Sequence, residues 1–136
     1  MKILACTDGS ANSTEAIRWA AQFAKNYKSD LAILHVMRGS SKEQGEIYSF
    51  EETKKEGQKI LEDTKMFIEK EFPGLKITVH LEGGNAAKAI VELAEKEKVD
   101  GMVLGSRGLG EFKRLLLGSV AQKVMVYAPC PVTVVR

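Results

Sequence analysis

Residues 99–119 read VDGMVLGSRGLGEFKRLLLGS and contain the clearest structural signal in the chain. Val99–Leu104 is a short, largely apolar run of the kind that forms a buried strand. Gly105 and Gly108 open the loop that follows, and nine residues separate Gly108 from the pair Gly118-Ser119. A helix is predicted to begin at Ser119. A strand, a glycine-rich loop and a helix in this order predict one βα unit of a parallel sheet.

The same alternation of strand and helix extends in both directions from this unit. Further strands are predicted at Lys2–Thr7, Leu31–Met37, Leu75–Glu82 and Pro131–Val135. Further helices are predicted to begin near Asn12, Ile47 and Asn85. The helix that begins near Ile47 is predicted to end near Phe72, and residues 38–46 before it are predicted to form a loop. Leu75–Glu82 alternates strictly between apolar and polar residues, which favours a half-exposed strand at a sheet edge. Helices between successive strands indicate a mainly parallel sheet covered on both faces.

Polar residues at the helix starts predict how each helix is capped. Asn12 with Glu15, and Ser119 with Gln122, have the spacing of capping boxes, and Asn85 is expected to cap the third helix. Apolar residues at helical spacing then predict the buried faces. These are Ile17, Ala20, Ala21, Ala24 and Tyr27; Phe50, Gly57, Leu61, Thr64 and Ile68, widened by Ile60 and Phe67; and Ala86, Ala89, Ile90, Leu93 and Ala94.

Composition narrows the class of protein. A chain of 136 residues with 44% apolar and 28% charged residues is expected to form one globular domain over residues 1–136. The net charge of +2 without a basic run argues against nucleic-acid or membrane-surface binding. No apolar run reaches the roughly 18 residues that span a bilayer. Cys6 and Cys130 are far apart and lack metal-ligand spacing, so a reducing, cytoplasmic setting is expected.

Two of the turns that follow strands carry residues suited to a ligand. One is Thr7-Asp8-Gly9-Ser10, and the other is the segment from Gly105 to Ser119. Glycines allow main-chain N–H groups to approach an anion, and the helix beginning at Ser119 presents the positive end of its dipole. Four basic residues and one acidic residue give positions 107–123 a net charge of +3. Simpler interpretations remain open: a turn and helix cap at Asp8–Ser10, ordinary loop glycines, and a solvated basic face.

The pattern Gly-x2-Gly-x9-Gly-Ser, with Leu115–Ala121 around its end, resembles the ATP-binding branch of the universal stress protein family. It is neither the phosphate loop GxxxxGK[ST] nor the dinucleotide motif GxGxxG. Ile3–Ser10 at the start and Ala128–Val135 at the end are similar to the first and last strands of that family, so the resemblance runs along the whole chain.

The resemblance implies a Rossmann-like α/β fold: a doubly wound, five-stranded parallel sheet in the order 3-2-1-4-5. That order puts Leu75–Glu82 at an edge and makes the Asp8 and Gly105 turns neighbours at the point where the strand order reverses. Ligands of open α/β sheets bind at such switch points. The family also implies homodimers that pair through the last strand, Val132–Val135.

Roles at the site follow from the resemblance as well. Thr7 and the main chain of Val36 should contact adenine, and Asp8 should lie near the ribose or a Mg²⁺ or Mn²⁺ ion. The loop glycines should approach the ribose and phosphates, and the start of the last helix should hold the phosphates. The predicted nucleotide-binding residues are Thr7, Asp8, Gly9, Val36, Gly105, Arg107, Gly108, Gly118, Ser119 and Val120.

The chemistry predicted for this site is binding rather than rapid turnover. Asp8 is the only carboxylate that the pattern places there, whereas phosphoryl transfer needs a positioned base and several metal ligands. We therefore expect a nucleotide-dependent switch that acts on an unidentified protein partner, with at most slow ATP hydrolysis. The alternative is a nucleotide-free interaction module whose main property is dimerisation.

Overall fold

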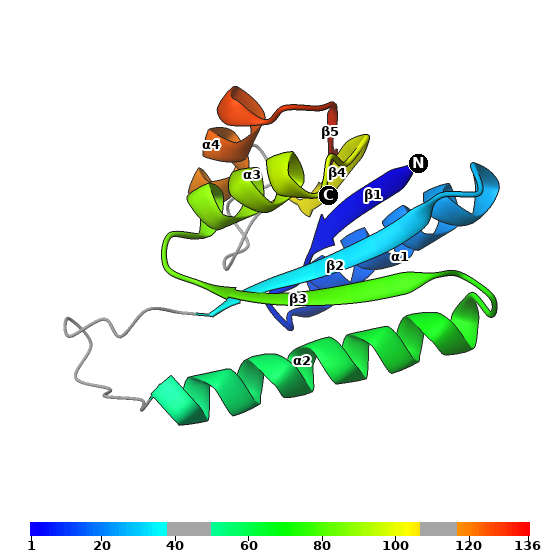
Figure 1. The fold of residues 1–136 in the computed structure, drawn as a ribbon, viewed down its shortest axis with the longest axis horizontal. Coiled ribbons are helices and arrows are strands. Elements are labelled where there is room, and N and C mark those ends of the chain that lie inside the picture. Colours follow the sequence, from blue (N-terminus) through cyan, green and yellow to red (C-terminus); the bar gives the residue numbers. More distant parts are fainter. Residues whose placement is uncertain (38–49, 107–116) are drawn as a thin grey trace.

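The computed structural model describes residues 1–37, 50–106 and 117–136 (Figure 1). Within these ranges strands and helices alternate as β1 Lys2–Cys6, α1 Ala11–Asn26, β2 Asp30–Met37, α2 Phe50–Glu71, β3 Ile77–Gly83, α3 Ala86–Lys96, β4 Gly101–Gly105, α4 Ser119–Tyr127 and β5 Val132–Val135. The elements confirm the predicted alternation. The loop predicted at 38–46 and the helix start predicted at 47–49 lie outside the described residues.

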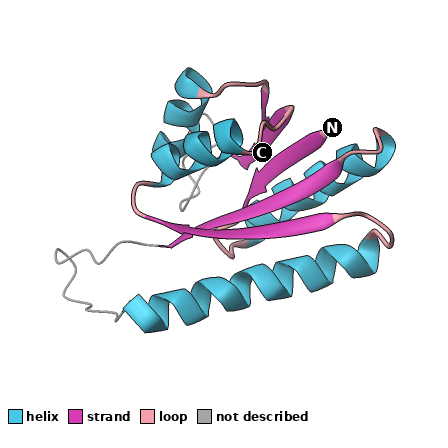
Figure 2. Ribbon diagram, viewed as in Figure 1, coloured by secondary structure: helices cyan, strands magenta, loops and turns pink. Residues whose placement is uncertain are grey.

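The strands form one parallel five-stranded sheet in the order β3-β2-β1-β4-β5, as predicted (Figure 2). Leu4 of β1 pairs with Ala32 of β2 on one side and with Met102 of β4 on the other. β3 lies at the sheet edge, which accounts for its alternating sequence. The chain therefore starts in the middle of the sheet and winds outward twice, first toward β3 and then toward β5.

Helices cover both faces of the sheet and create two separate cores. Successive side chains of a strand point to opposite faces, so each central strand contributes to both cores. The core beneath α1 and α2 contains Ile3, Ala5, Ile17, Ile33, Leu61 and Ile68, among others. The core beneath α3 and α4 contains Leu4, Leu34, Ile90, Met102 and Val124, among others. Each fully buried aliphatic side chain contributes about 1.5–3 kcal/mol, so these two layers hold the helices on the sheet.

The cap of α1 differs from the prediction. Ser10 is the N-cap, and its side-chain oxygen accepts a hydrogen bond from the Ser13 N–H at 3.2 Å. The capping box predicted at Asn12 and Glu15 is wrong, because the chain becomes helical directly after the Asp8-Gly9 turn. Glu15 instead accepts a hydrogen bond from the Arg18 guanidinium at 3.1 Å.

The cap predicted for α4 is also wrong, whereas the one for α3 is confirmed. Gly118 occupies the N-cap of α4, so Ser119 is the first helical residue, and the Gln122 amide donates to the carbonyl oxygen of Leu117 at 2.7 Å. In α3 the Asn85 side chain accepts from the Lys88 N–H at 3.0 Å. Glycine has no side chain to cap a helix, which leaves the start of α4 without this kind of hydrogen bond.

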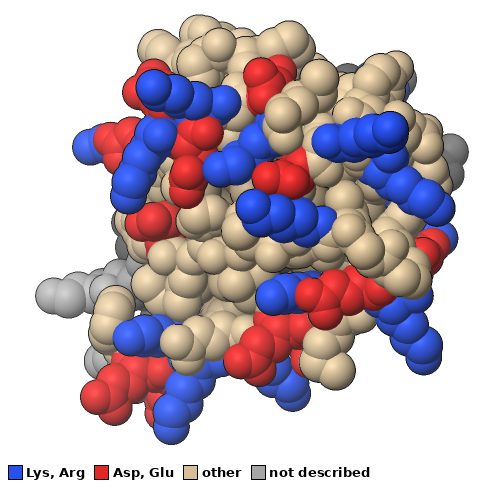
Figure 3. Space-filling view, turned by 45° about the vertical axis from the view of Figure 1, so that its right-hand side comes forward, with Lys and Arg blue, Asp and Glu red and all other residues tan. Residues whose placement is uncertain are grey.

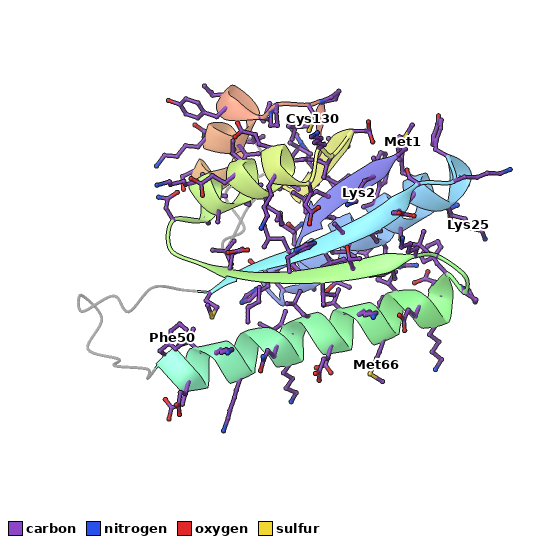
Figure 4. The ribbon with its side chains drawn as sticks, viewed as in Figure 1. Met1, Lys2, Lys25, Phe50, Met66 and Cys130 are labelled. Carbon is purple, nitrogen blue, oxygen red and sulfur yellow. The ribbon has the colours of Figure 1, made fainter. Side chains whose placement is uncertain are left out.

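Most residues of the predicted buried stripes are buried, and the exceptions lie both at helix ends and within the helices. Tyr27 is the C-cap of α1 and is 60% exposed, stacked on Phe23 with ring centroids 4.4 Å apart. Phe50 starts α2 and is 69% exposed, at the end of the helix where Figure 4 labels it. Phe67 is also exposed. In α3, Ala87 is buried in place of Ala86 and Ala89, which are half-buried.

Charged side chains of both signs are interspersed on the face shown in Figure 3, without a large patch of one sign. One cross-helix contact joins the Arg18 guanidinium of α1 to Glu71 of α2 at 2.6 Å. Among the described helices none combines the length and hydropathy needed to cross a membrane.

Candidate functional site

A pocket of about 330 Å³ opens at the carboxyl ends of the central strands. Its walls come from the ends of β1, β2 and β4 and from the first turns of α1, α3 and α4. β1 and β4 are neighbours, but the helices that follow them cover opposite faces of the sheet. The pocket therefore lies at the topological switch point, where open α/β sheets bind ligands.

The structure brings together seven of the ten residues predicted to bind nucleotide, and they line this pocket: Thr7, Asp8, Val36, Gly105, Gly118, Ser119 and Val120. Gly9 is not part of the lining. It adopts a φ of +84°, and a β-carbon there would lie 3.2 Å from Ile60 of α2. Arg107 and Gly108 are outside the described residues, as are the basic residues Lys113 and Arg114.

Sequence reasoning missed part of the lining. Leu34 lies two residues before Val36 on β2, so strand alternation was a signal that both face the pocket. Asn12 and Ser13 in the first turn of α1 also line the pocket, and nothing in their own segment marks them as neighbours of a ligand. Side chains from several other elements complete the lining: Cys6, Ala86, Ile90, Leu104 and Ala121.

Hydroxyl groups organise the turn between β1 and α1. The Thr7 hydroxyl lies 3.1 Å from the Ser13 hydroxyl and accepts a hydrogen bond from the Gly9 N–H, also at 3.1 Å. The Ser13 oxygen accepts from the Asp8 N–H at 3.3 Å, and Asp8 Oδ1 accepts from the Ser10 N–H at 2.9 Å. The turn is thus tied to α1 before any ligand binds.

This turn also determines the charge of Asp8. Partial burial would raise the pKa of the Asp8 carboxyl, but hydrogen bonds from the side chain and N–H of Ser10 and from Ser13 outweigh it and hold the pKa below its usual 3.8. The group is a carboxylate at neutral pH. It suits a cation or a ligand hydroxyl and would repel a phosphate placed directly on it.

On the opposite wall, the N-terminus of α4 is suited to an anion. Ser10 caps α1 and Asn85 caps α3, but no side chain caps α4 within the described ranges. Ser119, Val120 and the following Ala121 line the pocket at this helix start. First-turn N–H groups have no partner inside a helix and carry the positive end of its dipole. The pocket thus has an acidic wall and an anion-binding wall.

Gly105 and Cys6 contribute in different ways. A β-carbon on Gly105 would lie 2.6 Å from Asn12 Oδ1, so any larger residue there would displace the Asn12 side chain. Asn12 Oδ1 is buried and has no hydrogen-bond partner in the described part of the chain. Burial raises the pKa of the Cys6 thiol to about 12, so it is a neutral lining group and not a nucleophile.

The strand order and the position of the pocket place this chain in a class of proteins, the doubly wound α/β proteins with a pocket at the carboxyl edge of the sheet. Residues 1–136 match the model of the universal stress protein family, and the chain belongs to this family. It is 38% identical to universal stress protein MJ0531 of Methanocaldococcus jannaschii, over 99% of this chain and 81% of that protein.

Two further comparisons cover nearly the full length of both partners. The chain is 36% identical to universal stress protein YxiE of Bacillus subtilis, over 99% of this chain and 98% of that one. Among solved structures, it is similar to a universal stress protein in complex with cAMP, with 27% identity and a TM-score of 0.78 over 100% of this chain and 97% of that chain.

Proposed function

We propose that this chain binds an adenine nucleotide, with ATP as the intended ligand, in the pocket between the Asp8 turn and the start of α4. The observation that carries the proposal is the pairing of these two walls across one pocket. The main-chain N–H groups of Ser119 and Val120, after Gly118, take the phosphates. Asp8 takes a ribose hydroxyl or the metal ion that accompanies the phosphates.

The adenine ring is proposed to lie on the apolar part of the lining. Leu34, Val36 and Ile90 supply apolar surface there, and Thr7 stands beside it. A volume of about 330 Å³ is within the range of small-molecule sites, which are mostly apolar with a few polar groups. The similar universal stress protein solved with cAMP holds a ligand of the same chemical class. Gly9 is proposed to shape the turn, and Arg107 and Gly108 to assist at the phosphates.

A Mg²⁺ or Mn²⁺ ion fits this arrangement only together with the nucleotide. Among the described residues, no group of three or more His, Cys, Asp or Glu side chains lies together. Asp8 would therefore supply one oxygen ligand, and phosphate oxygens and water would supply the others, as is common for Mg²⁺. The ion neutralises phosphate charge and needs no dedicated cage.

The proposed role is that of a cytoplasmic, single-domain switch whose state is set by nucleotide occupancy. In the described lining Asp8 is the one carboxylate, and Cys6 is a neutral thiol. This favours binding, with at most slow hydrolysis, over rapid phosphoryl transfer. The protein that responds to occupancy is a separate, unidentified partner.

A homodimer through β5 is proposed as the assembly. β5 is the edge strand next to β4, and Val132–Val135 is a run of four uncharged residues that are mostly half-buried. On α4, the helix that precedes β5 in the chain, Met125, Val126 and Tyr127 are at least 50% exposed. An uncharged edge strand and exposed apolar side chains both favour pairing with a second copy. Light scattering at two protein concentrations tests this, and a monomer at both would contradict it.

Calorimetric titration with ATP, ADP, AMP and adenosine, each with Mg²⁺, tests the nucleotide site. Ser119→Glu places a negative charge at the start of α4, which stabilises the helix but repels phosphate. We expect ATP to bind at least about tenfold more weakly to this variant while adenosine binding and unfolding temperature are maintained. Gln58→Glu, at an exposed position of α2 outside the pocket lining, adds the same single negative charge and is the matched control.

Two results would reject the nucleotide site. One is the absence of binding to the unaltered chain at millimolar ATP with Mg²⁺. The other is an equal loss of ATP and adenosine affinity in Ser119→Glu. If α4 binds the phosphates, the affinity for ATP must fall more than the affinity for adenosine, which has no phosphate.

A further inference from the structure

His35 lies on the side of the sheet opposite the pocket. Its neighbours Leu34 and Val36 line the pocket, so strand alternation directs the imidazole toward α2. The side chain is buried, with 8% of the residue exposed. A buried polar ring needs a partner, and its partner connects it to the site.

That partner is the main chain of Thr7. His35 Nδ1 lies 2.8 Å from the Thr7 carbonyl oxygen. A carbonyl oxygen can only accept, so Nδ1 carries the hydrogen and donates it. The Thr7 N–H donates in turn to the Leu34 carbonyl oxygen at 2.9 Å. Two consecutive residues of β2 therefore hold both main-chain polar groups of Thr7, immediately after β1 ends.

Thr7 passes this constraint to the rest of the turn. Its hydroxyl accepts from the Gly9 N–H and pairs with Ser13, whose oxygen accepts from the Asp8 N–H. Asp8 lies in the chain between Thr7 and Gly9, both of which are held by these hydrogen bonds. A shift of the Thr7 carbonyl therefore moves the hydroxyl and the carboxylate that face the pocket.

The imidazole is held in place from its other side by α2. A β-carbon on Gly57 would lie 3.0 Å from His35 Cδ2 and 2.7 Å from Leu81 Cδ1. Gly57 is itself buried, so the helix backbone approaches the ring closely. With the turn on one side and α2 on the other, the ring has little freedom to move.

We infer that His35 is a positioning residue of the nucleotide pocket: without touching the ligand, it fixes the Thr7 carbonyl and thereby the placement of the Thr7 hydroxyl and Asp8. The affinity part of this inference rests on the proposed function. The geometric part concerns the turn alone and is tested without nucleotide.

Two substitutions separate positioning from packing. In His35→Asn the side-chain amide nitrogen takes nearly the place of Nδ1 and keeps the donor, but much of the ring's volume is lost. In His35→Leu most of the volume remains and the donor is lost. Packing alone ranks His35→Leu above His35→Asn in stability, because a smaller, polar side chain leaves a cavity. If His35 positions the turn, His35→Asn should bind ATP more tightly than His35→Leu, although it is the less stable of the two variants.

The measurements are ATP affinity by calorimetry and the urea midpoint of unfolding. We expect His35→Leu to bind ATP about tenfold more weakly, the size of one lost hydrogen bond, and His35→Asn to stay within about threefold of the unaltered chain. His80→Leu is the control, since His80 lies on the edge strand near Glu97 and outside the pocket. Its ATP affinity should not change.

Amide hydrogen exchange of Asp8 and Gly9 in the nucleotide-free protein gives the independent measurement. Exchange should accelerate in His35→Leu and stay slow in His35→Asn. If the unaltered chain binds no nucleotide, the proposed function fails, and exchange alone still decides whether His35 holds the turn. The inference is overturned if exchange at the turn is unchanged in His35→Leu, or if affinity follows the order of stability.

Discussion

Gly105 at the end of β4 lies against Asn12 in the first turn of α1, so closely that a β-carbon on Gly105 would come within 2.6 Å of Asn12 Oδ1. The two residues are 93 positions apart in the chain. Their contact forms part of the pocket between the two neighbouring central strands. It also leaves Asn12 Oδ1 buried without a partner among the described residues. Substitution of either residue therefore changes both packing and the site.

Gly105→Ala should destabilise the fold by about 1 kcal/mol, because the new methyl group displaces the Asn12 side chain, which can move toward the open pocket. ATP affinity should fall at least about tenfold, since Asn12 would be displaced within the pocket. Chemical denaturation and calorimetric titration measure the two effects. Gly101→Ala is the matched control on the same strand, where a β-carbon meets Ile3 at an ordinary 3.4 Å.

The same contact predicts coupling between the two positions. In an Asn12→Ala background, Gly105→Ala should cost less stability than in the unaltered chain, because the obstructing oxygen is gone. Equal costs in both backgrounds would show that the close approach of these residues does not limit the packing.

Ser10→Ala should lower the free energy of unfolding by about 1 kcal/mol, the usual contribution of an N-cap. Asn12→Ala should cost less, because it removes a buried acceptor that no donor satisfies. Urea denaturation of both variants makes the comparison. A larger loss of unfolding free energy in Asn12→Ala than in Ser10→Ala would indicate that Asn12, as predicted from the sequence, is the N-cap.

Gly57→Ala should destabilise the protein by about 1–3 kcal/mol, although alanine favours a helix over glycine by about 1 kcal/mol. The new β-carbon would meet Leu81 Cδ1 at 2.7 Å and His35 Cδ2 at 3.0 Å, so the Leu81 side chain, the ring or α2 itself must shift. Thermal unfolding measures the loss. Gln58→Ala, at the next and exposed position of α2, should change stability by no more than about 0.5 kcal/mol. A stabilised Gly57→Ala would contradict the close approach.

Asp8 should make stability depend on acid pH. Its pKa in the folded chain lies below the usual value, because hydrogen bonds from Ser10 and Ser13 outweigh its partial burial. The Asp8 carboxylate therefore makes its full contribution to the free energy of unfolding above the unfolded-state pKa of about 4. That contribution is lost as pH falls through the lower folded-state pKa. Urea midpoints between pH 2 and 6 should fall less steeply in Asp8→Asn than in the unaltered chain. Parallel curves would show that Asp8 contributes nothing to the acid response.

The elements that the sequence predicted correctly depend on local pattern. Leu31–Met37 reads as a buried strand because it is almost continuously apolar, and Leu75–Glu82 reads as an edge strand because it alternates. The caps predicted at Asn12 and Ser119 and the burial predicted for Tyr27 and Phe50 are wrong, and all four residues lie at helix ends; the burial predicted for Phe67, within α2, is wrong as well. At helix ends the start of a helix depends on the turn before it, and burial depends on how far the sheet extends beneath it.

The sequence predicts those site residues that a motif or the family resemblance marks. Thr7, Asp8, Val36, Gly105 and Gly118–Val120 are named in this way, and they line the pocket. Asn12 and Ile90 are not, because nothing in their own segments marks them as neighbours of a ligand. They reach the pocket from the N-terminal parts of α1 and α3, whose placement follows from the packing of those helices on opposite faces of the sheet.

The sequence by itself determined the alternation of strands and helices, the turns that carry ligand-binding residues, and membership of a family, because each of these depends on neighbouring residues or a fixed spacing. Only the tertiary structure decided that Gly9 packs against α2 and is not part of the pocket lining, that the start of α4 lacks a side-chain cap in the described chain, and that His35 of β2 contacts Thr7 after the neighbouring strand β1. These relationships join segments distant in sequence, and their geometry arises when α1 and α2 pack on one face of the sheet and α3 and α4 on the other.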